Sequence, residues 1–320
     1  MKYNLPVNWT VLANRLFVNN RPTQLAATAT TKATVAAALN TTVDYRDRIS
    51  VVTWLLIFGL GLSLLFTMPI VTLTLHVLGS PISLSLTPRL VAAIFLATLA
   101  AAGTESVIRI HPRFAAIATR RRSIRRTWPY WALPMAIAII STFLLPYAPS
   151  PPVRVIALLV IAVLLVATFF GLYATIERNR SGFRRARIAL DALSYSAALL
   201  LFLFVYQTRT RSLLSGTLIA LIAILIAVEL LRSTTDQPRT IFTYGAIVGL
   251  ILGQVTWALN YWWTLNDLSG GLVLLLIFYL LVGIAQHGLQ GHLTRKILIE
   301  FAIFAVLALL LIAVVGPGFG

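Results

Sequence analysis

The sequence contains no cysteine among its 320 residues. This absence excludes disulfides, thiolate nucleophiles, iron–sulfur clusters and cysteine-type zinc sites. Charge is also scarce, since only 11% of the residues are charged and nine acidic residues stand against 26 Lys and Arg. A soluble globular domain has about a quarter of its residues charged. We therefore do not expect a soluble protein.

Hydrophobic residues make up 59% of the chain, and they gather in long runs. A helix needs about 20 apolar residues to cross about 30 Å of hydrocarbon. Hydropathy predicts spans at Val51–Leu78, Leu90–Ile108, Tyr130–Pro146, Val155–Thr175, Ile188–Tyr206, Leu213–Leu231, Ile241–Trp262, Leu268–Ala285 and Ile297–Val315. The predicted fold is an all-α polytopic transmembrane helix bundle of about nine spans.

Two of these spans are irregular. Val51–Leu78 is overlong and contains Pro69, so a kink or a strong tilt is expected there. Leu90–Ile108 is interrupted near its end by Thr104, Glu105 and Ser106. Whether residues 90–108 cross fully is therefore left open.

The chain divides into three regions. Residues 1–50 form a cytoplasmic N-terminal segment without an apolar stretch of signal-peptide length. Within it, Trp9, Leu12, Leu16 and Phe17 recur at helical spacing, which fits a short interfacial helix or an ordinary packed loop. Residues 51–315 form the transmembrane domain, and residues 316–320 form a short exterior tail.

The basic residues follow the predicted topology. Of the 26 Lys and Arg, 22 lie on every second connection, and only Arg89, Arg154, Arg209 and Arg211 lie on the other side. Loops rich in Lys and Arg stay in the cytoplasm. The N-terminus is therefore predicted inside and the C-terminus outside.

The cytoplasmic arginines are candidates for binding anionic lipid headgroups, because they flank apolar spans. The expected headgroup-binding residues are Arg120, Arg121, Arg122, Arg125, Arg126, Arg184, Arg185 and Arg187. The alternative is that they only set the topology. A net charge of +17 could also suggest nucleic acid, but no basic domain interleaved with aromatics lies outside the membrane. We expect lipid partners and no nucleic acid.

Four acidic residues at span ends lie one helical turn from a base, in the pairs Glu105–Arg109, Arg187–Asp191, Glu229–Arg232 and Lys296–Glu300. They are either interfacial ion pairs or parts of a converging site that binds a lipid phosphate, in which carboxylates orient arginines. The second reading predicts a cytoplasmic polar site from Glu105, Arg109, Asp191, Glu229, Arg232 and Glu300.

Other chemistry finds little support. His287 and His292 are five residues apart around two glycines, which is poor spacing for a metal pair on one helical face. We read them as loop histidines and expect no metal and no cofactor. Serines such as Ser194 and Ser215 lack the Gly-x-Ser-x-Gly elbow of hydrolases. We therefore expect no catalytic residues, and activity as an enzyme stays undecided.

A stripe of small residues indicates close helix packing. Gly245, Gly249 and Gly253 recur every four residues and lead to Trp257. Small residues at this spacing let helix backbones approach in a membrane. A helix of the same chain is the expected partner, with another protein as the alternative. Gln254 and Asn260 are expected to hydrogen-bond across helices.

The stretch from Glu229 to Arg232, with Gly253–Trp262 after it, resembles a pattern in uncharacterised bacterial multi-pass membrane proteins classed as a domain of unknown function. The resemblance covers about the last third of the chain. It implies a protein of the bacterial inner membrane without an assigned activity, and it supplies no catalytic residue.

These features favour a non-catalytic membrane scaffold or accessory subunit with a basic cytoplasmic face, lipid contacts and a membrane protein partner. A transporter or flippase for an amphipathic or lipid-linked substrate is the first alternative, since such cargo needs a cleft more than buried charges. A membrane enzyme acting on a lipid phosphate at the cytoplasmic face is the second.

Overall fold

The computed structural model describes residues 45–65, 71–77, 80–115, 126–177, 182–207, 212–235, 237–262 and 267–315. The chain separates into two compact units, residues 1–46 and residues 47–320. The predicted interfacial helix around Trp9 and the tail 316–320 lie outside the described residues. Almost all of the described residues belong to the second unit.

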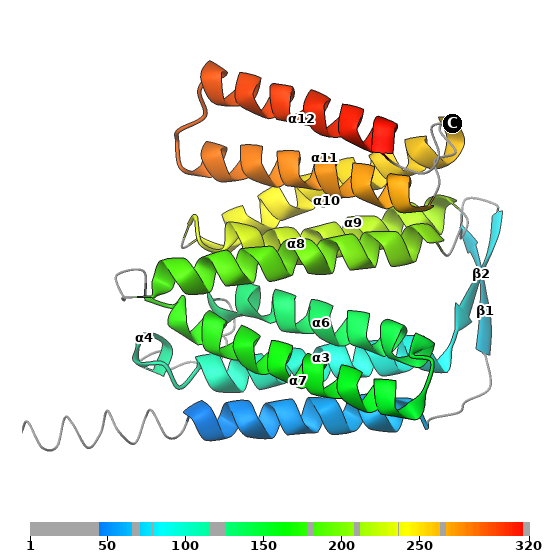
Figure 1. Ribbon diagram of the computed structural model, residues 1–320, viewed down its shortest axis with the longest axis vertical. Helices are drawn as coiled ribbons and strands as arrows, with labels where there is room; N and C mark the ends of the chain where they lie inside the picture. The colour runs from blue at the N-terminus through cyan, green and yellow to red at the C-terminus, as the bar shows by residue number, and fades with distance from the viewer. Residues whose placement is uncertain are drawn as a thin grey trace, which may run out of the picture. The chain divides into compact units, whose positions relative to one another are not determined.

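This unit is built from long helices that lie side by side (Figure 1). In chain order they are residues 45–63, α3 (Pro88–Ile108), α6 (Ala132–Leu144) with the 3-10 turns η1 (Trp128–Trp131) and η2 (Leu145–Tyr147), α7 (Pro151–Ala174), α8 (Phe183–Gln207), α9 (Ser212–Leu231), α10 (Pro238–Trp262), α11 (Asp267–Leu289) and α12 (Arg295–Val315). A short helix, α4 (Pro112–Ala115), follows α3.

Six helical segments of the described chain are long and apolar enough to cross a membrane: α3, η1 to η2, α7, α8, α10 and α11. The protein is therefore a polytopic transmembrane helix bundle, as predicted. Exactly nine spans are not confirmed. Of the other three helices, α9 shows a shorter apolar stretch, Ser215–Leu231. Residues 45–63 and α12 carry several charges in their first turns.

The prediction of one span over Val51–Leu78 is wrong in its second half. The first helix ends at residue 63, and Val71–Val77 forms strand β1, which pairs antiparallel with β2 (Ser80–Leu86). In the sequence, β1 alternates apolar residues with Thr72, Thr74 and His76. This period of two is that of a strand, and average hydropathy alone does not separate it from a helix.

The ends of the helices follow local sequence signals. The Thr87 side chain accepts a hydrogen bond from the Leu90 backbone N–H at 3.2 Å, and Pro88 occupies the first turn of α3. α7 begins at two consecutive prolines, Pro151 and Pro152. Proline is favoured at the first helical position because its missing N–H has no helical partner there. These signals fix where the apolar segments start.

Glycines set the closest helix contacts. A Cβ on Gly253 would lie 3.0 Å from the Gly216 carbonyl oxygen, and one on Gly249 would lie 2.6 Å from the Ala220 oxygen and would also overlap Ile224. A Cβ on Gly245 would lie 3.3 Å from Val228 Cγ2, a looser contact with a side chain of α9. The stripe therefore seats α9 of the same chain, whereas Trp257 is 48% exposed. α9 and α10 form the most extensive helix pair of the described chain.

The helices alternate in direction, so their ends gather at two levels. We call the level with α4 and the starts of α8, α10 and α12 the α4 end, and the level of the β1–β2 hairpin the hairpin end (Figure 1). At the hairpin end Asn260 donates to Ser215 Oγ at 2.9 Å, which ties α10 to α9. The polar contacts that follow lie at the α4 end.

Candidate functional site

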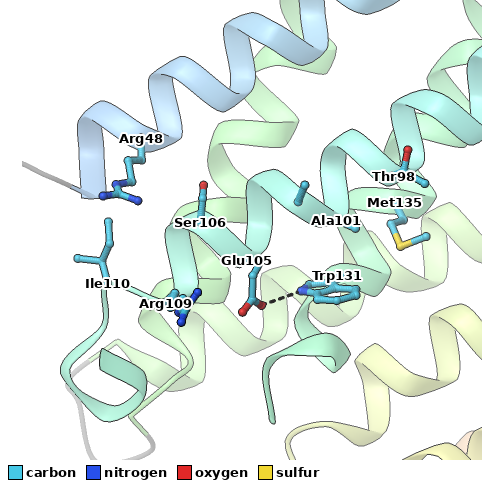
Figure 2. Close-up of a pocket in the computed structure, with 10 residues that line it drawn as sticks. Arg48, Thr98, Ala101, Glu105, Ser106, Arg109, Ile110, Trp131 and Met135 are labelled. Atoms are coloured by element: carbon cyan, nitrogen blue, oxygen red, sulfur yellow. Dashed lines mark hydrogen bonds between the residues drawn. The ribbon is translucent and has the colours of Figure 1, made fainter. Parts of the chain in front are cut away.

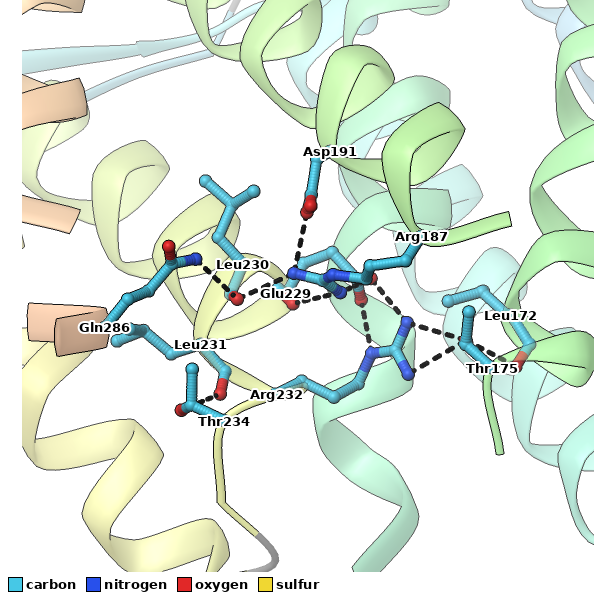
Figure 3. Close-up of polar contacts among 10 residues, drawn as sticks. All are labelled: Leu172, Thr175, Arg187, Asp191, Glu229, Leu230, Leu231, Arg232, Thr234 and Gln286. Carbon is cyan, nitrogen blue, oxygen red and sulfur yellow. Dashed lines mark hydrogen bonds and ion pairs between the residues drawn. The ribbon is translucent and has the colours of Figure 1, made fainter. Parts of the chain in front are cut away.

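The C-terminal end of α9 is closed by side chains from other helices (Figure 3). The last carbonyls of a helix lack partners within it. Arg187, on the first turns of α8, donates to the Leu230 oxygen at 2.7 Å and to the Glu229 oxygen at 3.3 Å. Gln286 of α11 donates to the Leu230 oxygen at 3.1 Å. A cation at this position also complements the helix dipole.

Glu229 is the centre of the ion pairs. Its carboxylate lies 2.6 Å from Arg232 Nη2 and 3.5 Å from Arg187 Nη1, and its side chain is 1% exposed. Arg232 Nε also donates to the second carboxylate oxygen at 3.0 Å. Arg187 pairs in turn with Asp191 at 2.7 Å. We call Arg187, Asp191, Glu229 and Arg232 the charge cluster.

Arg232 is held from two further sides. Its two terminal nitrogens each donate to Thr175 Oγ1 at 3.2 Å, just past the end of α7. Its guanidinium carbon lies 4.3 Å from the centre of the Tyr130 ring, which belongs to η1. A cation over an aromatic face gains electrostatic attraction. The charge cluster thus joins η1, α7, α8 and α9.

The charge cluster is formally neutral, with two arginines and two carboxylates. The side chains of Arg187 and Arg232 are 9% and 4% exposed, and the terminal guanidinium nitrogens of both already have acceptors. A buried charge is tolerated when it is paired and hydrogen-bonded. The arrangement suits a structural clamp, since neither arginine presents an unpaired face to a phosphate.

Glu105 lies apart from the charge cluster. Its Oε2 accepts hydrogen bonds from Thr127 Oγ1 and, at 3.2 Å, from Trp131 Nε1, so it binds η1 and its flank rather than Arg109 (Figure 2). η1 therefore contacts Glu105 through Trp131 and Arg232 through Tyr130. This turn connects the two polar regions.

The structure brings together only part of the predicted polar site. Asp191, Glu229 and Arg232 meet, and they do so with Arg187, which sequence reasoning assigned to the headgroup arginines. Arg109 is half-buried at the end of α3, and Glu300 is exposed on α12. The pairs Arg187–Asp191 and Glu229–Arg232 form as expected from their spacing.

The expected headgroup arginines fall into three groups. Arg126, Arg184 and Arg185 are exposed at the α4 end. Arg187 is buried, which separates it from that group. The remaining members lie outside the described residues: Arg120, Arg121, Arg122 and Arg125.

The histidines contact protein groups. His287 was read as a loop residue, but it lies inside α11, where its ring packs against Phe301 of α12 and its Nδ1 lies 2.9 Å from the Gly283 oxygen. Buried His111 lies 3.5 Å from Glu177 and edge-on to Tyr173. No group of three potential metal ligands occurs among the residues that the structure describes.

Sequence reasoning missed Thr175, Tyr130 and Gln286. Each is a polar side chain near a span end on the basic side of the predicted topology. Location near the same membrane face was the signal available. It does not reveal which helices are neighbours, and so it could not assign these side chains to Arg187 or Arg232.

Comparison with known proteins assigns the chain to a family, but it assigns no activity. No curated protein and no solved structure matches the chain. A family model described as "Protein of unknown function (DUF5656)" matches residues 68–315. This match takes in α3 to α12 and the charge cluster, well beyond the last third in which the sequence resemblance was noted. The chain belongs to the DUF5656 family of proteins of unknown function.

Proposed function

We propose that this protein is a non-catalytic scaffold or accessory subunit of the bacterial cytoplasmic membrane, with its α4 end in the cytoplasm. The observation that carries the proposal is the charge cluster, in which two buried arginines are neutralised by buried Glu229 and by the partly exposed Asp191. Buried ionisable groups in a membrane are usually the parts of a proton path or substrate site. Here they join helix ends.

The exposed arginines have a different role in this proposal. Arg126, Arg184 and Arg185 are exposed at the same end and are not members of the cluster. Near an anionic leaflet each such residue contributes about 1 kcal/mol of binding. They are the proposed contacts to anionic lipid.

The partner in this proposal is another membrane protein. α12 packs chiefly against α11 and exposes apolar side chains along its length, among them Ile299, Ile303, Leu307 and Leu311. Such a face suits either lipid or a second helix. The Asn260–Ser215 hydrogen bond ties two helices together, so it lends the transporter alternative no support.

The test is purification from native membranes in a mild detergent, with mass spectrometry of the copurifying proteins and lipids. We expect a membrane protein in fixed ratio and an excess of anionic lipid over the bulk membrane. A protein that purifies alone with the bulk lipid composition would contradict the proposal. Turnover of a lipid phosphate by the pure protein would replace it with the enzyme alternative.

A further inference from the structure

A cavity of about 800 Å³ opens beside α3 at the α4 end. Arg48 of the first helix, Glu105 and Arg109 of α3, and Trp131 and Met135 of the η1–α6 segment contribute to its wall (Figure 2). Its wall helices pack through glycines, since a Cβ on Gly103 would overlap Val52.

The polarity of the cavity changes along its length. Arg48 and Arg109 lie at the end near α4, whereas Thr98 and Met135 lie at the opposite end (Figure 2). From Arg109 to Thr98 is 11 residues of α3, or about 16 Å at 1.5 Å per residue. That is about half of the hydrocarbon thickness. A ligand filling this space needs a negatively charged group in its head and an apolar tail.

Glu105 sets a second requirement for the ligand. Its Oε1 is buried and, within the described chain, has no hydrogen-bond partner, while Oε2 takes the Thr127 and Trp131 donors. A buried acceptor left without a donor is unfavourable. A donor on the ligand would satisfy it. The head therefore needs a hydroxyl or ammonium group as well as a negative group.

We propose that this cavity binds one glycerophospholipid whose headgroup carries both a phosphate and a hydrogen-bond donor. Arg48 and Arg109 contact the phosphate, since guanidinium groups bind phosphate oxygens through paired donors. Glu105 Oε1 accepts from the headgroup ammonium or hydroxyl. An acyl chain follows Ala101 towards Met135. The exposed arginines of the proposed scaffold are not part of this site.

The test compares phosphatidylethanolamine with phosphatidylcholine of the same acyl chains, bound to the full-length protein and measured by native mass spectrometry. Both lipids have the same net charge, and only the first has a headgroup donor. We expect about a tenfold preference for phosphatidylethanolamine, which corresponds to about 1.4 kcal/mol. Because neither lipid is anionic, the result is separate from any test of the exposed arginines.

Substitutions in the cavity test which residues contact the lipid. Glu105→Gln should remove the preference while both lipids still bind, and Arg109→Gln should weaken both lipids. Ala102 lines the cavity and is exposed, so Ala102→Phe should block binding without disturbing the core. Arg184→Gln is the matched control and should change nothing.

Three results would overturn the proposal. The first is equal binding of the two lipids by the unchanged protein, and the second is an unchanged preference in a folded Glu105→Gln. The third is displacement of the lipid by glycerophosphoethanolamine, the same headgroup without chains, at comparable concentration. That outcome would assign the cavity to a soluble phosphate compound.

Discussion

Glu229 is the residue on which the charge cluster depends. It faces Arg187 and Arg232 together, and all three side chains are buried. Removing one partner of a buried ion pair leaves an uncompensated charge, whereas an exposed pair contributes little. The same residue type at Glu300 is exposed on α12. The two glutamates therefore differ sharply in what their charge does for stability.

Glu229→Gln should lower the free energy of unfolding by about 3–5 kcal/mol, because two arginines remain buried beside a neutral amide. Glu300→Gln should change it by less than about 0.5 kcal/mol. Unfolding by SDS in lipid bicelles, followed by tryptophan fluorescence, measures both. Equal effects of the two substitutions would show that the cluster is open to water.

Spacing along the chain predicts contacts within one helix and little beyond. The pairs Arg187–Asp191 and Glu229–Arg232 could be predicted because residues three or four apart share a helical face. The contact between Arg187 and Glu229 joins residues 42 apart, and it depends on which helices are neighbours. For Glu105 the spacing along the chain predicted the wrong partner. Its carboxylate was expected to pair with Arg109, but it accepts a hydrogen bond from Trp131 of another segment.

Among the elements, α9 and α10 pack with backbone against backbone. In a membrane, helices associate through close packing more than through a hydrophobic drive. The stripe on α10 meets Gly216 and Ala220 of α9, with carbonyl oxygens at the contact. Backbone atoms cannot move aside as a flexible side chain can. This pair should therefore be the least tolerant of added volume.

Gly249→Leu should cost about 1–3 kcal/mol through overpacking, since its Cβ already meets Ala220 and Ile224. Gly61→Leu is the matched control, because a Cβ there meets nothing within 4 Å.

Thermal aggregation in detergent compares the two leucine variants. Both gain helix propensity by losing a glycine, so the difference between their midpoints reports packing alone. We expect a lower midpoint for Gly249→Leu. Coinciding midpoints would mean that α9 does not rest against the stripe.

Apolar periodicity located most elements and failed at one place for a physical reason. The helices α3, α7 and α10 lie within a few residues of predicted spans. The stretch around Val71–Val77 satisfied a hydropathy average but alternates with a period of two, so it pairs with Ser80–Leu86 instead of continuing a helix. The segment around His287, expected to be a loop, is also helical. Here α11 continues through polar residues to Leu289.

On the scale of the whole molecule, the distribution of charge predicts an orientation in the membrane. Lys and Arg concentrate at the α4 end, where Arg126, Arg184 and Arg185 are exposed. Basic residues close to span ends keep a loop in the cytoplasm. The charge bias was readable from the sequence, whereas the division into buried and exposed arginines required the structure.

Reporter fusions at both termini test this orientation. We expect a cytoplasmic N-terminus and an exterior C-terminus, because the opposite orientation would move the most basic loops across the membrane. A cytoplasmic C-terminus would show an even number of crossings, and with the α4 end inside, α12 would then be the first candidate for a surface position.

We propose that buried charge holds the bundle together and that the exposed arginines contact anionic lipid. Lipid retention by the purified protein, in nanodiscs of mixed phosphatidylglycerol and phosphatidylcholine, tests the lipid contact directly. We expect phosphatidylglycerol to be enriched around the protein at about 0.1 M salt and released towards 1 M, as the Debye length falls from about 10 Å to about 3 Å.

Two double variants complete this measurement. Changing Arg184 and Arg185 to Gln should reduce the enrichment, whereas changing both to Lys, which keeps the charge, should preserve it. Equal retention of the two lipids by the unchanged protein at low salt would contradict the account.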